Sequence, residues 1–148
     1  MTELETIEFN HQAKIQIRFN DIDVLGHVNN AVQVMYFDYG KIKYFEALKN
    51  QVIDWRGSEL VMVNVNIDFM EPIFVPNHIV VKTKVYEIGN KSMKLIQMIK
   101  DYETNHIKSV CRSVMCGFDP KTNKSLQITD EWRNLINRFE QYLPVCPV

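Results

Sequence analysis

Alternation of apolar and polar residues is the clearest pattern in this chain, and it predicts strands. Residues 11–20 alternate with apolar side chains at Ala13, Ile15, Ile17 and Phe19. A period of two predicts a strand with one buried face. Residues 59–70 alternate in the same way, which would put one set of apolar side chains on one face: Val61, Val63, Val65, Ile67 and Phe69.

Three further strands are predicted as an antiparallel meander over residues 78–88, 92–103 and 106–119. Gly89-Asn90 and Thr104-Asn105 suit the turns between them. Residues 92–103 also fit a helical pattern, but their position between two turns favours a strand.

A long stretch between the first two strands has apolar residues at helical spacing. It predicts a helix from about Asn30 to Leu48, capped by Asn29 and Asn30. One stripe comprises Val28, Val32, Met35, Tyr39 and Ile42, and a second comprises Val34, Phe37, Phe45 and Leu48. A helix that is apolar around most of its girth is expected to be surrounded by other structure. A second helix is predicted from Thr129 to about Tyr142.

The order of these elements is strand, long helix, four strands, helix. An antiparallel sheet with one helix inserted early can wrap around that helix, which is an α+β arrangement. The length of 148 residues suits a single domain spanning 1–148.

Composition narrows the classes of partner. The chain is 46% hydrophobic and 24% charged, with a net charge of -1, so no global basic field favours nucleic acid. It lacks a run of 18 apolar residues, so no membrane span is expected. The polar, acidic N-terminus does not resemble a secretory signal.

The cysteines favour a reducing compartment. Cys111, Cys116 and Cys146 form an odd set without disulfide or zinc spacing, and His78 and His106 have no partner at metal-ligand spacing. We expect no metal and a cytoplasmic location.

The segment from Arg18 to Asn30 (RFNDIDVLGHVNN) concentrates the candidate chemistry. It brings Asp23 to the start of the long helix, where backbone N–H groups are free and the helix dipole is positive. A carboxylate beside such donors suits acyl-group chemistry, because the donors stabilise a developing oxyanion. A simple turn role for Asp23 is the competing interpretation.

This segment, with Tyr36 further along the helix, resembles the signature of 4-hydroxybenzoyl-CoA thioesterase-like acyl-CoA thioesterases. The likeness covers roughly residues 10–120, and its Gly-His-Val-Asn-Asn ending resembles a subgroup of bacterial thioesterases and plant acyl-ACP relatives. The resemblance implies a hotdog fold, in which a curled antiparallel sheet surrounds a central helix, here with an extra C-terminal helix. It also implies that Asp23, the second acid of a D-x-D-x-x-G motif, is the catalytic carboxylate.

The remaining site residues follow from this resemblance and from residue chemistry. Gly26, His27, Asn29 and Asn30 are expected to position the substrate or form the oxyanion site, the backbone N–H near Asn30 being the useful donor. Tyr36, Val63 and Asn66 are candidates for lining the substrate site, the last two from a neighbouring subunit. Asp21 is expected to buttress the loop, paired with Arg18.

The expected reaction is hydrolysis of an acyl thioester to acid and thiol, with Asp23 as nucleophile or general base. No cofactor is expected, since coenzyme A or phosphopantetheine belongs to the substrate. The carrier could be coenzyme A or an acyl-carrier protein. Lysines of the meander could bind the phosphates of coenzyme A or the acidic surface of a carrier protein. The alternatives are a non-catalytic acyl-thioester or lipid-binding protein and a hydroxyacyl dehydratase. Open sheet edges and the resemblance favour a homodimer or homotetramer.

Overall fold

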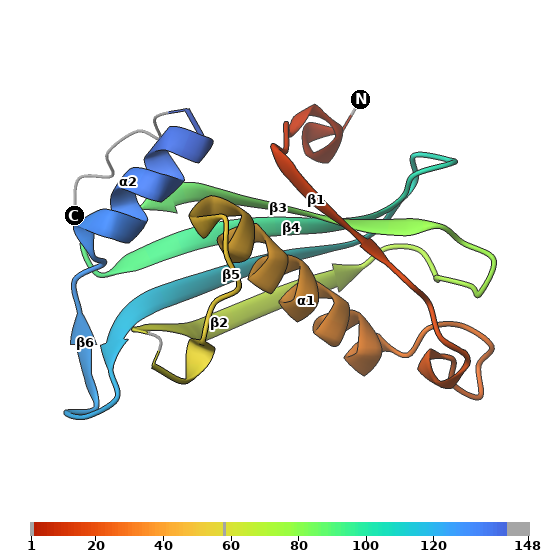
Figure 1. Cartoon of the computed structure of the whole chain (residues 1–148). Helices are drawn as coiled ribbons and strands as arrows, with labels where there is room; N and C mark the ends of the chain where they lie inside the picture. The colour runs from red at the N-terminus through yellow and green to blue at the C-terminus, as the bar shows by residue number, and fades with distance from the viewer. Residues whose placement is uncertain (1, 58, 142–148) are drawn as a thin grey trace.

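The computed structural model describes residues 2–57 and 59–141, and it contains one curled sheet around one long helix (Figure 1). The strand order is β1-β3-β4-β5-β2, with β6 paired to β5, and every pairing is antiparallel. The strands are β1 (His11–Ile15), β2 (Leu60–Phe69), β3 (Ile79–Ile88), β4 (Ser92–Asp101), β5 (Ile107–Asp119) and β6 (Lys124–Leu126). The helices are α1 (Asn30–Lys49) and α2 (Asp130–Phe139), with 3-10 turns at Glu3–Thr6, Phe19–Asp21 and Trp55–Gly57.

This architecture confirms the predicted α+β class, the long helix with its Asn29 cap, and the four strands after it. Thr129 caps α2 as expected, accepting from the Trp132 N–H. The helix ends at Phe139 rather than near Tyr142, which lies outside the described residues. The short strand β6 was not predicted.

The first strand is shorter than its alternating pattern predicts, ending at Ile15 rather than at residue 20. Phe19, predicted to share the buried face, is 90% exposed. β1 ends at Ile15 because Ile15 pairs with Ile79, the first residue of its neighbour β3. Farther along, the Asp21 carboxylate accepts from the Arg18 N–H at the 3-10 turn of residues 19–21.

The predicted face of β2 is also wrong in part. Met62 pairs with Met115 and Asn64 with Val114, so Val63 is an extra residue in a β-bulge. The bulge shifts the alternation by one position. Consequently Leu60 and Met62 share the helix-facing side with Val65 and Ile67, whereas Val63 is 58% exposed.

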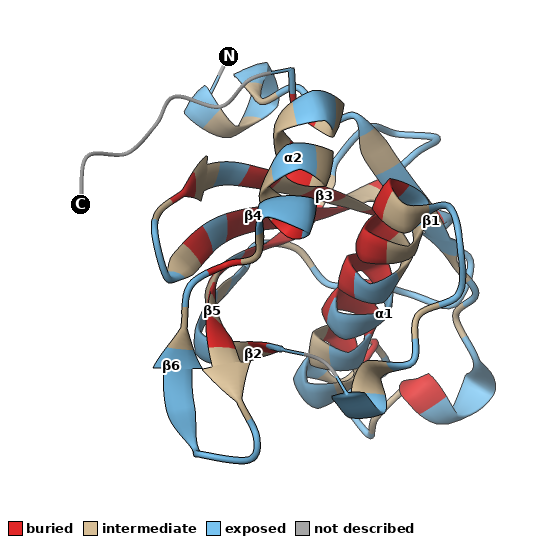
Figure 2. Cartoon of the chain, turned by 60° about the vertical axis from the view of Figure 1, so that its left-hand side comes forward, coloured by how far each residue is buried: buried red, intermediate tan, exposed pale blue. Residues whose placement is uncertain are grey.

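The core lies between α1 and the concave face of the sheet, where buried residues line the side of α1 that faces the strands (Figure 2). Val81, Thr83 and Val85 of β3 all point into it and are fully buried. Gly40 allows α1 to approach β3 closely, because a Cβ atom there would collide with Val81. Each large side chain buried in this layer stabilises the fold by about 1.5–3 kcal/mol.

One side of α1 is not covered. Met35 is 55% exposed, Tyr39 45% and Ile42 36%, although the sequence pattern predicted that other structure surrounds the helix. The convex face of the sheet is covered in part by the N-terminal segment, whose Leu4, Ile7 and Phe9 pack on Ile96, Met98 and Val110.

Candidate active site

The loop between β1 and α1 is held in place by Asp21. Its buried carboxylate accepts from the Tyr36 hydroxyl at 2.5 Å and from the Arg18 N–H at 2.9 Å. The Arg18 guanidinium lies 3.8 Å away, so the predicted pairing is present. Burial, and then the hydrogen bond to Asp21, raise the pKa of Tyr36 above its ordinary range, which keeps the phenol protonated as a donor. Asp21 therefore connects the loop to the body of α1.

Asp23 lies in a tight turn that returns the chain to the helix. Its N–H donates to the His27 carbonyl at 3.1 Å, and the Gly26 N–H donates to the Asp23 carbonyl at 3.0 Å. Gly26 has φ of +86°, a conformation that glycine adopts without strain. Ile22 and Val28 close the turn as an antiparallel bridge.

The Asp23 carboxylate is half-buried, and both of its oxygens accept hydrogen bonds. Oδ1 accepts from the Leu25 N–H at 2.9 Å, and Oδ2 accepts from the Asn29 side-chain amide at 3.3 Å. The same Asn29 side chain accepts from the Ala31 N–H at 2.8 Å as the cap of α1. One side chain thus joins the carboxylate to the first turn of the helix.

A cavity of about 260 Å³ opens beside this turn, lined by His27, Asn30, Gln33 and residues 69–72. The His27 ring packs edge-on to Phe74, with Nδ1 at 3.3 Å from the Val28 carbonyl oxygen. Asn30 is the first residue of α1, so the helix N-terminus borders the cavity. An anionic oxygen in this space would meet the positive end of the helix dipole.

Gln33 is a lining residue that sequence reasoning missed. It is 2% exposed, and its Oε1 accepts from the Ser109 hydroxyl at 2.8 Å. The available signal was a polar residue three positions after Asn30, which places both side chains on one face of the helix.

The structure does not bring the three predicted lining residues into this cavity. Tyr36 borders a groove of about 510 Å³ on the β1 side of α1, together with Met35 and Tyr39. Val63 and Asn66 are exposed on β2, the last strand on one side of the sheet. Within this chain, then, Asp23, Gly26, His27, Asn29 and Asn30 come together, and the roles of Tyr36, Val63 and Asn66 stay predictions.

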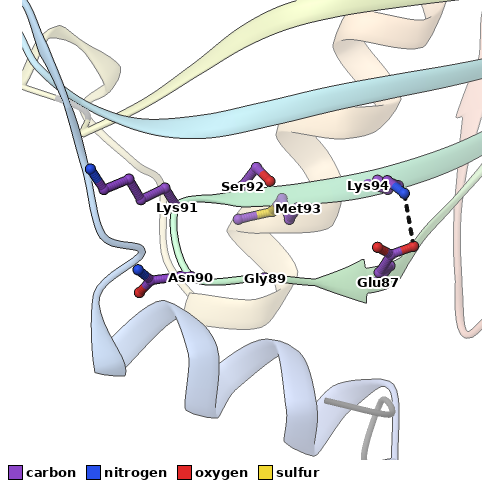
Figure 3. A pocket seen from close by; sticks show the side chains of 7 residues that line it. All are labelled: Glu87, Gly89, Asn90, Lys91, Ser92, Met93 and Lys94. Atoms are coloured by element: carbon purple, nitrogen blue, oxygen red, sulfur yellow. Dashed lines mark hydrogen bonds and ion pairs between the residues drawn. The ribbon is translucent and has the colours of Figure 1, made fainter. Parts of the chain in front are cut away.

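Two lysines of the meander, Lys91 and Lys94, lie away from this loop. A cavity of about 390 Å³ is lined by Lys91, Ser92 and Lys94 at the β3–β4 turn, where Lys94 forms an ion pair with Glu87 (Figure 3). This turn and the Asp23 loop lie at opposite ends of the curled sheet (Figure 1). The cavity is therefore separate from the loop chemistry.

Residues 2–57 and 59–141 contain neither a membrane-spanning helix nor a metal-binding cluster. No helix there is long and apolar enough to cross a membrane. No group of three or more His, Cys, Asp and Glu side chains there is arranged to hold a metal ion.

Comparison with known proteins identifies the family. Residues 17–136 match the model of the thioesterase-like superfamily. The chain belongs to this superfamily. The match spans the Asp23 loop, α1, strands β2 to β6 and most of α2, and the chain is a thioester hydrolase.

Individual relatives of this superfamily protein are distant in sequence. It is 26% identical over 132 residues to the long-chain acyl-CoA thioesterase FadM of Escherichia coli, covering 86% of this chain and 98% of FadM. Its structure is similar to a Thermus thermophilus thioesterase complexed with coenzyme A and Zn (TM-score 0.79, 23% identity, 90% and 96% covered). It is also similar to a Staphylococcus aureus protein in complex with CoA (TM-score 0.79, 14% identity, 93% and 87% covered). These likenesses confirm the hotdog fold.

Proposed function

We propose that this thioesterase-like protein hydrolyses acyl-CoA thioesters, with Asp23 as its catalytic carboxylate. The observation that carries the proposal is the double role of Asn29, whose amide donates to Asp23 while its oxygen caps α1. This places the carboxylate beside the helix N–H groups that would receive the carbonyl oxygen. The sequence likeness to FadM supports acyl-CoA as the substrate class, and the Gly-His-Val-Asn-Asn ending supports the bacterial subgroup.

Two routes are consistent with this placement. As a base, Asp23 takes a proton from water, and the water oxygen attacks the thioester carbonyl. As a nucleophile, a carboxylate oxygen attacks instead and forms an acyl anhydride that water then hydrolyses. In both routes the carbonyl oxygen becomes an oxyanion near the Asn30 N–H, the C–S bond breaks, and the departing thiolate takes up a proton. Loss of one such oxyanion donor typically lowers the rate by about 10²–10³.

Gly26 and His27 complete the proposed site. Gly26 permits the turn that presents the carboxylate, and His27 lines the adjacent cavity. A thioester carbonyl bound there would lie between the helix N-terminus and the loop. The reaction needs no cofactor in this scheme, because coenzyme A is part of the substrate.

We further propose that the active protein is at least a homodimer. β2 has no neighbour in the described sheet on its outer side, and open strand edges are a liability that pairing removes. The exposed apolar side chains Met35, Tyr39 and Val63 are also available for a second copy to cover. Val63 and Asn66 would then reach the neighbour's site. Light scattering that gives the mass of a single chain would refute this.

A cytoplasmic location remains a proposal that rests on the cysteines. Cys111 and Cys116 are free thiols, as a reducing compartment favours. Burial raises the pKa of the Cys111 thiol to about 11, so it stays protonated and unreactive.

Thiol release from a panel of short, long and aromatic acyl-CoAs tests the proposal. We expect turnover by the native protein and a loss of about 10³ or more in Asp23→Asn, with the fold intact by circular dichroism. Turnover that is indifferent to the substitution would remove Asp23 from the chemistry. If no acyl-CoA is hydrolysed, the same panel on an acyl-carrier protein separates a carrier-protein thioesterase from a binding protein. A single turnover in ¹⁸O-water adds a test of the route. Label in the Asp23 side chain would establish the nucleophilic route, because it enters only when water attacks the Asp23 carbonyl of an acyl anhydride.

A further inference from the structure

Three cavities follow one another between α1 and β2. The first is the cavity beside Asn30, which Gln33 and Phe69 also line. The second, of about 280 Å³, is lined by Val34 on α1 and by Ile67 and Val65 on β2. The order of lining residues along both elements shows that the second cavity lies farther from the Asp23 loop.

The third cavity continues in the same direction. It has a volume of about 260 Å³ and is lined by Phe45 of α1, Leu60 of β2 and Trp55. Asp38 and Lys41 line both the second and the third cavity, so their side chains stand at the boundary between the two. Most of the other lining side chains are apolar.

Asp38 and Lys41 form an ion pair at this boundary, and its ammonium group is largely buried among apolar side chains. Lys41 Nζ lies 2.8 Å from Asp38 Oδ1, and the Lys41 side chain is only 11% exposed. An ammonium group has three N–H donors. Besides Asp38, the Lys41 ammonium contacts the weak acceptor Met62 Sδ at 3.9 Å within the described residues. The Asp38 carboxylate accepts this bond through Oδ1, and its side chain is 54% exposed, so Oδ2 can accept from water or from a bound ligand. Both charged groups line the cavities and retain hydrogen-bonding capacity.

We propose that this pair makes the row of three cavities between α1 and β2 selective for acyl chains that carry a hydroxyl group far from the thioester, an inference that rests on the proposed function. The hydroxyl oxygen would accept from the Lys41 ammonium, and the hydroxyl proton would be donated to Asp38 Oδ2. An unsubstituted methylene chain would desolvate the pair and give it no new partner, which is costly. A terminal carboxylate would bring a second negative charge beside Asp38. A neutral hydroxyl group therefore fits the pair best.

Helix geometry sets the position of that hydroxyl group. At about 1.5 Å per residue, Asp38 and Lys41 lie about 12 Å and 16 Å along α1 from Asn30. An extended chain with carbon–carbon bonds of about 1.5 Å advances about 1.3 Å per carbon. The hydroxyl group is thus expected about 10–13 carbons from the thioester, and 12-hydroxydodecanoyl-CoA is the matching probe.

The experiment compares kcat/KM for 12-hydroxydodecanoyl-CoA with that for dodecanoyl-CoA. We expect the native protein to favour the hydroxylated ester by about tenfold or more, since hydrogen bonds to charged groups are the strong ones. In Lys41→Met the ratio is expected to fall to one or below. Lys43→Met is the matched control, because Lys43 forms the same i,i+3 ion pair, with Glu46 at 3.0 Å, on the more exposed side of the same helix. It is expected to keep the native ratio.

A native ratio near one, or a ratio that Lys41→Met leaves unchanged, would overturn the inference. If Lys41→Met does not fold, Asp38→Asn serves instead and is expected to lower the ratio at least several-fold. This test does not depend on whether Asp23 is catalytic. A preference for the hydroxylated ester that Lys41→Met abolishes would support the inference even if Asp23→Asn remained active. If neither ester is hydrolysed, calorimetry with 12-hydroxydodecanoic and dodecanoic acids decides: tighter binding of the hydroxy acid that is lost in Lys41→Met supports the inference, and equal binding overturns it.

Discussion

Asn29 offers a way to separate the stability of the loop from its chemistry. Its oxygen caps α1 through the Ala31 N–H, while its amide donates to Asp23 Oδ2. Asn29→Ser keeps an oxygen that can cap the helix but has no amide to reach the carboxylate. Asn29→Ala loses both interactions. The two variants should therefore differ in stability but share a loss of activity.

The expected magnitudes follow from these bonds. Loss of a helix cap costs about 1 kcal/mol, so Asn29→Ala should lower the melting temperature by about 2–4 °C, whereas Asn29→Ser should stay close to native. A hydrogen bond to a charged group contributes about 1.5–3 kcal/mol, so both variants should lose about 10- to 100-fold in kcat/KM if that bond orients Asp23 for reaction. Thermal melts and thiol-release kinetics measure the two effects.

Thr129→Ala is the control for this comparison. Thr129 caps α2 by accepting from the Trp132 N–H at 3.3 Å, so its loss costs similar stability without touching the loop. Native activity is expected in that variant. The reasoning would be refuted if Asn29→Ser retained full activity, or if Thr129→Ala lost as much activity as Asn29→Ala.

Three other substitutions test the fold and its electrostatics. Gly40→Ala should destabilise the protein by about 1–3 kcal/mol in urea unfolding, because the new Cβ collides with Val81; unchanged stability would contradict the close packing. Tyr36→Phe should lower the free energy of unfolding by about 1.5–3 kcal/mol, since the Asp21 carboxylate loses a buried donor, and a neutral result would refute that role. Burial raises the pKa of the Glu140 carboxyl above its ordinary value of about 4.5. Between that value and the raised one, the folded chain holds a proton that the unfolded chain has lost, so the free energy of unfolding declines as pH rises. Glu140→Gln should reduce this decline in urea unfolding measured from pH 4 to pH 8, and an unchanged slope would assign the decline to other groups.

Local patterns predicted most of the fold, because period and capping act over a few residues. Every predicted bound of α1 and of strands β2 to β5 lies within two residues of the observed bound. The errors arose where strand pairing departed from the period. β1 ended early because its partner β3 begins opposite Ile15, and the bulge at Val63 shifted the faces of β2 on one side of the bulge. Neither feature is visible as a pattern of apolar residues.

The candidate site was predictable only as a segment. Asp23, Gly26 and Asn29 stand close in sequence, and turn and cap preferences placed them correctly beside the helix start. That the Asn29 amide faces Asp23 depends on the path of the turn, which the sequence pattern does not specify. Gln33 and the Asp38–Lys41 pair were not predicted, because the cavities that they line form only when β2 packs along α1.

The most direct measurement of the central claim is the rate of thiol release by Asp23→Asn beside that of Asp119→Asn. Asp119 is a matched turn carboxylate, which accepts from the Lys121 N–H at 2.9 Å and the Thr122 hydroxyl at 2.9 Å, far along the chain in the β5–β6 turn. We predict that Asp23→Asn loses about 10³ or more in kcat while Asp119→Asn retains native turnover. Equal rates in the two variants, with both folded, would contradict the assignment of Asp23 as the catalytic carboxylate.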